Sequence, residues 1–306
     1  MLNRFEIRRI PGIGCGCMRA WECGSAQTLR PTHARTPMLS IILICILAAG
    51  MAHAADVKLD KGPVPLAVGN KWEYSVTQNG VMSVSDGEKS ESTEIRSTGS
   101  CVEEITGVKE RRPNGDVVYE DRQTTKTEKG INVEASGSTV ESLLMKSKDG
   151  TYILGSKSTG MGGLLTGEWV RYNPPLVIYG SGLKAGKKWK IGTIREGKLT
   201  MPMYAQVAGT ESVTVPAGTF DECVKLFITC NRVSGIMGSG NDTAEIKEGK
   251  SVTTVWLSPG VGVVKEDNIL QAKMEFPADE QGRTFSMTGT QRKIKELQPG
   301  YKADSE

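Results

Sequence analysis

Val213-Thr214-Val215-Pro216-Ala217-Gly218-Thr219-Phe220 opens the stretch that decides the fold, and the stretch continues to residue 265. Two apolar runs flank this Pro/Gly turn, and a second pair of runs, 251–257 and 261–265, flanks Ser258-Pro259-Gly260. Apolar runs joined by turn residues are typical of antiparallel hairpins. Within residues 220–232, alternate positions share one face, and the apolar face holds Val224, Leu226, Ile228 and Cys230. The stretch therefore predicts a meander of antiparallel strands.

The same alternation recurs along the chain. Trp72, Tyr74 and Val76 alternate with polar residues, and further alternating segments lie at 81–85, 92–97, 101–107 and 117–127. Asn114-Gly115 is a strong hairpin signal because both residue types tolerate positive φ. A short helix competes with strand at residues 140–148, and no longer amphipathic helix is evident. We therefore expect a mainly β fold with few short helices.

The N-terminal segment is typical of an export signal. Residues 39–49 form an apolar run, and Ala52-His53-Ala54 follows as a cleavage site, so we expect a leader over 1–54 and a mature chain from Ala55. A translation start at Met18 would supply the positive charge that such a leader uses. The run is too short to span a bilayer comfortably, since a membrane helix needs about 20 apolar residues. The prediction is one mainly β domain over 55–306, located in the periplasm or secreted.

Loss of the leader changes the chemistry that is available. It removes six of the 38 basic residues and two of the 35 acidic ones, which leaves 32 bases and 33 acids. This near-neutral balance does not favour nucleic-acid binding, which depends on clustered Lys and Arg. Both histidines, His33 and His53, also lie in the leader. A chain without histidine cannot form a Ser-His-Asp triad, which favours a binding function over an enzymatic one without deciding between them, and we expect neither cofactor nor metal.

The cysteines predict one structural disulfide. Four of the seven lie in the leader, and Cys101, Cys223 and Cys230 remain. An exported protein is oxidised, so one bridge and one free thiol are expected. On a single strand Cys223 and Cys230 would be about 23 Å apart, beyond the roughly 7 Å limit between bridged Cα atoms. Any bridge therefore includes Cys101.

A short motif occurs twice with the same spacing. Leu183, Gly186, Trp189 and Ile191 repeat the offsets of an earlier set, Leu66, Gly69, Trp72 and Tyr74. Each set predicts a tight glycine turn that leads into a Trp-bearing strand. One interpretation is a duplicated domain whose halves start near residues 65 and 182. The other is two similar strand entries in one sheet.

Three phrases carry a resemblance to known proteins. They are Pro65-Leu66-x-x-Gly69-x-x-Trp72-x-Tyr74, Val213-x-Val215-Pro216-Ala217-Gly218-Thr219-Phe220-x-x-Cys223-x-Lys225 and Trp256-x-x-Pro259-Gly260-Val261-Gly262-x-Val264-Lys265. They resemble recurring phrases of bacterial secreted proteins of unknown function. Those proteins are similar in turn to lipoprotein carriers and lipoprotein receptors. The resemblance implies a curved antiparallel sheet or half-barrel built of meandering hairpins, with a concave face.

The four mature tryptophans are the candidate ligand-binding residues: Trp72, Trp169, Trp189 and Trp256. In a sheet protein such residues mostly fill the core. If the sheet curls, some would line a concave apolar surface able to take an acyl chain or a hydrophobic peptide. The expected function is therefore non-enzymatic binding of a hydrophobic ligand or a lipidated partner in the cell envelope.

Two other functions remain open. One is a module that docks to another envelope protein through an exposed sheet edge. The other is a carboxylate-dependent hydrolase, which needs two acids brought together from distant strands. The adjacent acid pairs cannot serve, because neighbours on a strand point to opposite faces; these pairs are Glu103-Glu104, Glu120-Asp121 and Asp221-Glu222.

Overall fold

The computed structural model describes residues 64–160, 167–180, 182–196, 198–237, 243–278 and 282–304. These ranges form antiparallel strands and contain no helix, and hence none with the length and hydropathy of a membrane span. The strands are β1 (Lys71–Ser85), β2 (Ser90–Arg111), β3 (Val117–Thr127), β4 (Ser136–Ser147), β5 (Gly150–Gly160), β6 (Val170–Gly180), β7 (Lys188–Glu196), β8 (Leu199–Val215), β9 (Gly218–Cys230), β10 (Gly235–Met237), β11 (Ala244–Ser258), β12 (Gly262–Glu275) and β13 (Ser286–Leu297).

The predicted mainly β class is confirmed. The few short helices expected from the sequence are not found in the described ranges, and residues 140–148, where a helix competed, belong almost entirely to β4. The predicted leader, 1–54, lies outside the described residues, so its cleavage before Ala55 stays a prediction.

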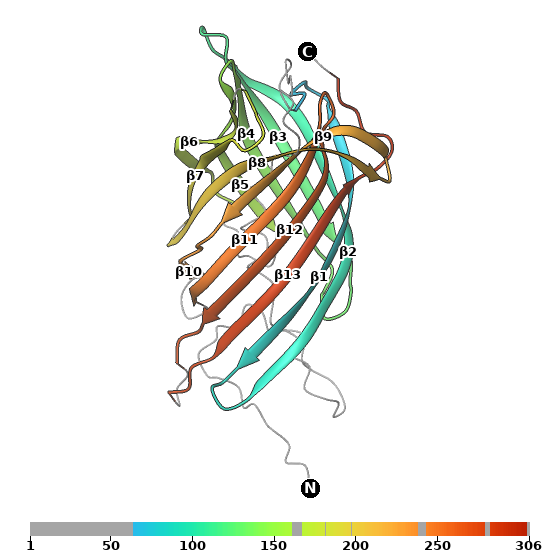
Figure 1. The fold of residues 1–306 in the computed structure, drawn as a ribbon. Coiled ribbons are helices and arrows are strands. Elements are labelled where there is room, and N and C mark those ends of the chain that lie inside the picture. The colour runs from blue at the N-terminus through green and yellow to red at the C-terminus, as the bar shows by residue number, and fades with distance from the viewer. Residues whose placement is uncertain are drawn as a thin grey trace.

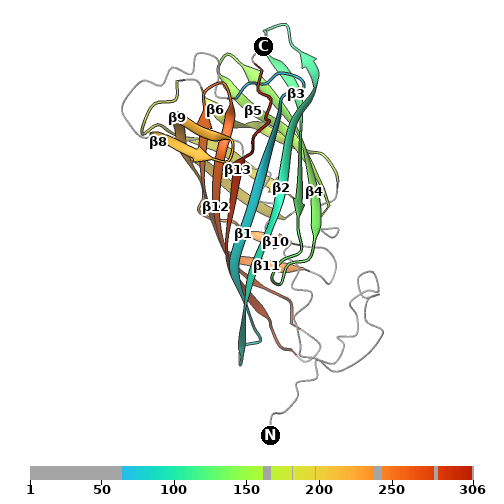
Figure 2. The same ribbon diagram turned by 90° about the vertical axis from the view of Figure 1, so that its right-hand side faces the viewer.

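Most strands pair with their neighbours in the chain. The hydrogen-bonded order is β6-β5-β4-β3-β2-β1-β13-β12-β11-β9-β8-β7, with the short β10 paired to β11. Pairing of β1 with β13 joins the two ends of the chain, so the sheet curls into a nearly closed barrel shape (Figures 1 and 2). The curved meander predicted from the sequence is therefore present, and it wraps further than a half-barrel.

The barrel closes at a seam between β6 and β7, which are not joined by a β-ladder. Trp189 of β7 donates its indole N–H to the backbone carbonyl of Val177 in β6, at 3.0 Å. Close by, a Cβ at Gly192 would lie 2.4 Å from Cδ2 of Leu176, so glycine lets the two strands approach. Side-chain packing and this indole contact, instead of a ladder, hold the seam.

The predicted turns are confirmed. Residues 113–116 connect β2 to β3 with Gly115 at φ 88°, and Pro216-Ala217 connects β8 to β9. The two repeated motifs both form a turn with glycine at positive φ: Gly69 has φ 86° and Gly186 has φ 80°. The second motif lies at the seam, in the connection from β6 to β7. Duplication of a half-domain stays a prediction.

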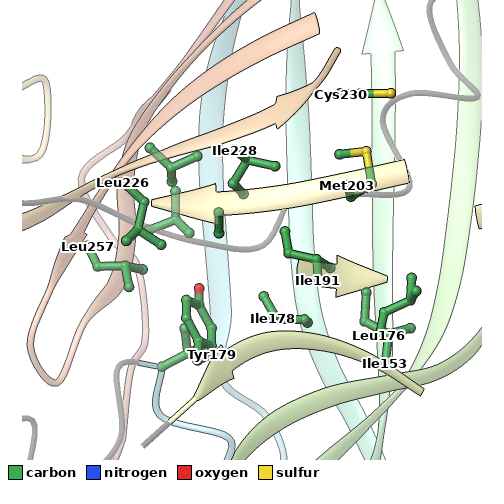
Figure 3. Close-up of a cluster of buried hydrophobic side chains, with 14 of the residues drawn as sticks. Ile153, Leu176, Ile178, Tyr179, Ile191, Met203, Leu226, Ile228, Cys230 and Leu257 are labelled. Atoms are coloured by element: carbon green, nitrogen blue, oxygen red, sulfur yellow. The ribbon is translucent and has the colours of Figure 1, made fainter. Parts of the chain in front are cut away.

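Strand β9 shows why the apolar alternation produces a core. Leu226, Ile228 and Cys230 are buried as predicted, whereas Lys225 is half-buried between Val224 and Leu226. Cys223, expected on the opposite face, is also buried, because the β8–β9 register shifts between Glu211 and Val213. Figure 3 shows this side of the core, where side chains of β5, β6, β7, β8, β9 and β11 meet inside the barrel.

Five strands extend past the others. Pairing of β2 with β3 stops at Gly99 and Thr127, whereas its pairing with β1 continues to Ser90. On the other side, pairing of β11 with β9 stops at Ser251, and its pairing with β12 continues beyond this point. We give the name inner wall to a set of apolar inward-facing residues of this extension: Met82, Ile95, Ile246, Gly249, Leu270, Ala272, Met274, Met287 and Gly289. Figure 1 shows the long strands β1, β2, β11, β12 and β13.

Candidate functional site

Two of the predicted tryptophans anchor the barrel. Trp72 is 1% exposed and donates its indole N–H to the carbonyl of Val261, 2.6 Å away across the interior. Trp189 makes the seam contact with β6. Both side chains have their polar atom satisfied by backbone, as core tryptophans usually do.

The other two tryptophans are in different surroundings. Trp256 lies between the fully buried Val255 and Leu257, so it points to the outer face, where it donates to Glu211 Oε1 at 2.5 Å. Trp169 precedes β6 and is 41% exposed, with Arg171 5.5 Å from its ring centroid. The four tryptophans therefore do not line one common surface, and their role in ligand binding stays a prediction.

The predicted disulfide is not formed. Cys101, Cys223 and Cys230 are free and buried. Cys223 and Cys230 share β9, as expected, whereas Cys101 lies on β2, and four strands separate β2 from β9 in the sheet order. At about 4.8 Å per strand spacing the separation along the sheet is roughly 24 Å. Burial raises the pKa of the Cys223 thiol to about 12, so this sulfur is a poor nucleophile at neutral pH.

The interior contains a ring of polar side chains that we call the polar belt. Inward-facing positions on consecutive strands supply it, and the registers place them side by side: one row runs Thr253, Asn268, Lys293, Gln78 and Ser97. A second row runs from Glu103 through Gln123 and Val140 to Ser158. The belt comprises Gln78, Ser97, Glu103, Asp121, Gln123, Ser142, Ser158, Tyr179, Thr253, Glu266, Asn268, Gln291, Lys293 and Lys295.

A buried ion pair forms the centre of the belt. Lys295 Nζ lies 3.1 Å from Glu103 Oε2, and the two side chains are 4% and 5% exposed. Gln123 donates to the same carboxylate at 3.4 Å, and Nζ lies 4.1 Å from the ring centroid of Tyr74. Burial is the largest single effect and disfavours the charged lysine, but the neighbouring acidic groups, Glu103 foremost, together outweigh it and raise the pKa of Lys295 well above its ordinary value. The lysine of the pair therefore keeps its charge at neutral pH.

Asp121 is the acid beside this pair. Burial, reinforced by the negative charge of Glu103, raises the pKa of Asp121 well above its ordinary value, which favours the neutral carboxyl. On the other side of Lys295, burial raises the pKa of Glu266 and lowers that of Lys293. Burial thus disfavours the charged forms of Asp121, Glu266 and Lys293, whereas Lys295 is held in its charged form beside Glu103.

Several belt atoms lack partners. Five buried polar atoms make no hydrogen bond among the described residues: Ser97 Oγ, Asp121 Oδ1, Ser158 Oγ, Tyr179 OH and Gln291 Nε2. Their side chains come from β2, β3, β5, β6 and β13, which lie on different sides of the barrel. Buried polar groups in native proteins are nearly always paired with protein, water or ligand. Among the described residues, the belt therefore has five buried polar atoms with unused capacity for hydrogen bonding.

The sequence reasoning missed this site. The sequence offered acids that are adjacent in the chain as pairs, whereas the two acids that meet come from different pairs. Glu103 and Asp121 face the interior, and their chain neighbours Glu104 and Glu120 are half-buried on the opposite faces of the strands. A usable signal was present: each belt residue occupies the apolar phase of an alternating strand, as Glu103 does between Cys101 and Ile105. A charged side chain in that phase indicates a buried charge that needs a partner.

A groove on the outer face is the other hollow near the long strands. It has a volume of about 580 Å³ and crosses β11, β12, β13 and β1. Four basic residues and one acid line it: Arg232, Lys247, Lys250, Lys273 and Glu248. Lys247 is already paired with Glu245 of its own strand at 2.5 Å and with Glu275 of β12 at 3.4 Å. The groove is open to solvent, in contrast to the belt.

The described residues contain no group of three or more potential ligands arranged to hold a metal ion. No protein-family model matches the chain, and comparison with curated proteins finds no match.

Proposed function

We propose that the protein is an exported, non-enzymatic binding protein of the cell envelope that holds a hydrophobic ligand, or the lipid of a lipidated partner, inside the barrel. One observation carries the proposal: the inner wall is apolar and continues directly from the polar belt. Ile95, Leu270 and Met274 are inner-wall side chains, and each is 3 or 4% exposed. An amphiphile would place its chain along the wall and its polar group at the belt.

Small residues at β12 and β13 leave room for such a chain. Ala272 and Gly289 are direct neighbours there, whereas Gly249, the neighbour of Ala272 on β11, is already covered by Val233. A Cβ at Gly289 would meet one backbone oxygen at 3.7 Å, which is an ordinary contact, and its φ is not positive. A larger side chain at this position would fill space at the wall without backbone strain.

The test fills that space. Gly289→Leu should abolish binding of an apolar fluorescent dye and its displacement by long-chain amphiphiles, whereas Thr290→Leu, which points to the outer face, should leave both unchanged. Matching thermal unfolding curves of the two variants would show that both are folded. Equal dye binding by both variants would refute an interior site, and loss with Thr290→Leu alone would place the ligand in the outer groove.

A hydrolase is the second candidate, and the interior acids favour it. Glu103 and Asp121 lie on neighbouring strands, both face the interior, and Glu103 acts on the pKa of Asp121. One neutral and one ionised carboxyl is the arrangement that glycosidases use. Turnover of nitrophenyl glycosides that disappears in both Glu103→Gln and Asp121→Asn would support this candidate over the binding function.

A further inference from the structure

The five unpartnered atoms of the polar belt constrain what can bind there. Ser97, Ser158 and Tyr179 carry hydroxyls, each of which can donate and accept one or more hydrogen bonds, and Gln291 Nε2 can only donate. A ligand that satisfies this set must accept at least from Gln291, and it can exchange hydrogen bonds in either direction with the hydroxyls. An ammonium group only donates and cannot serve Gln291, whereas carboxylates, phosphates and the hydroxyls of sugars or glycerol can all accept, so the charges of the belt must separate these head groups.

The charges of the belt favour an uncharged, hydroxyl-bearing head group. Glu103 is paired with the charged Lys295, and Glu266 lies opposite Lys295 in the β12–β13 register. Burial favours the neutral forms of Asp121, Glu266 and Lys293, so the belt offers no free counter-charge. A charged head group would enter this buried ring without a counter-charge, and burying an unpaired charge is strongly unfavourable.

We infer that the polar belt binds the uncharged, hydroxyl-bearing head group of an amphiphile, such as an alkyl glycoside or a monoacylglycerol. The inference rests on the proposed function, because the inner wall must hold the apolar chain. The hydroxyls of the head group replace the partners that Ser97, Ser158, Tyr179 and Gln291 lack.

Three probes with the same twelve-carbon chain separate the head groups: dodecyl glucoside, dodecanoate and dodecylammonium. Displacement of the apolar dye from the full-length exported protein at neutral pH should show dodecyl glucoside binding about tenfold or more tightly than either ion, since one to two hydrogen bonds are worth that ratio. Tighter binding of dodecanoate or dodecylammonium would overturn the inference and leave the proposed function intact.

Variants test whether the unpartnered hydroxyls are the contacts. Ser97→Ala and Ser158→Ala should each weaken dodecyl glucoside binding by about threefold to tenfold and leave dodecanoate binding unchanged. Neither should lower the melting temperature, because each removes a buried hydroxyl that has no partner. Ser100→Ala, on the exposed face of the same strand as Ser97, is the matched control and should change neither.

The outcomes are distinguishable. If the dye binds and Gly289→Leu blocks it, but both alanine variants bind the glucoside normally, the belt holds water and the inference fails alone. Lower melting temperatures with unchanged binding would assign the hydroxyls a structural role and would also overturn it. If no probe displaces the dye, the proposed function fails. If, in addition, methyl glucoside does not change the melting temperature, the head-group inference fails too.

Discussion

Loss of one partner from the buried ion pair should be the most damaging single change in the belt. Lys295→Met leaves the carboxylate of Glu103 buried without its cation. At the observed 3.1 Å the attraction is roughly 5 kcal/mol for an effective dielectric constant of about 20. Because removing one member of a buried pair leaves an uncompensated charge, we expect the free energy of unfolding to fall by about 3 to 5 kcal/mol.

A double-mutant cycle followed by urea unfolding and tryptophan fluorescence measures the effect. Glu103→Met combined with Lys295→Met removes both charges, so the double variant should be more stable than the sum of the single losses predicts. The exposed pair Lys71 and Glu73, 2.5 Å apart with side chains 44% and 49% exposed, is the control. Lys71→Met should cost much less than Lys295→Met, because water screens the exposed pair.

The reasoning is refuted if Lys295→Met costs no more than Lys71→Met, or if the cycle shows no coupling between Glu103 and Lys295. Either result would mean that water solvates the pair, and the belt would then be an open channel instead of a buried ring.

Three further predictions concern other buried groups. Because the pKa of Asp121 is raised in the folded protein, the unfolded state binds fewer protons above pH 3.8, and the free energy of unfolding should fall as pH rises from there. Each tenfold change in proton affinity is worth about 1.4 kcal/mol. Urea unfolding at several pH values should show that Asp121→Asn removes this fall. Mass spectrometry after alkylation should find Cys101, Cys223 and Cys230 unmodified in the native protein and all three modified after unfolding without reductant. Modification of only one cysteine after unfolding would instead show that the other two form a disulfide. Gly99→Ala should cost about 1 to 3 kcal/mol in the same unfolding assay, because its Cβ would lie 2.0 Å from a backbone oxygen of β3; an unchanged midpoint would contradict this packing.

The fold was predictable because its signals are local. Gly115 and Pro216 mark turns through the φ angles that they allow, and Leu226 and Ile228 identify the buried face through a period of two. Residues 140–148 were ambiguous because Leu143, Leu144 and Met145 suit a helix as well as a strand. Pairing on both sides, with β3 and β5, decides for strand, and that pairing is not visible in the segment itself.

The candidate site was much less predictable, because it depends on register. Glu103 and Lys295 are 192 positions apart, and their contact follows from β1 pairing with both β2 and β13. The disulfide was expected from compartment and cysteine count, and neither reveals that β9 and β2 are distant in the sheet. The tryptophans were grouped by residue type, whereas their strand faces separate them: Trp72 points inward and Trp256 outward.

The seam between β6 and β7 gives the barrel a direction of opening. Elsewhere around the described sheet, parting two neighbouring strands breaks a ladder of backbone hydrogen bonds, but here it breaks side-chain packing and the indole contact of Trp189. Local opening follows the lowest free-energy route, so amide protons of β6 and β7 should exchange with deuterated water well before those of β1 and β2. Any molecule that exchanges between solvent and the interior faces its smallest kinetic barrier along this line.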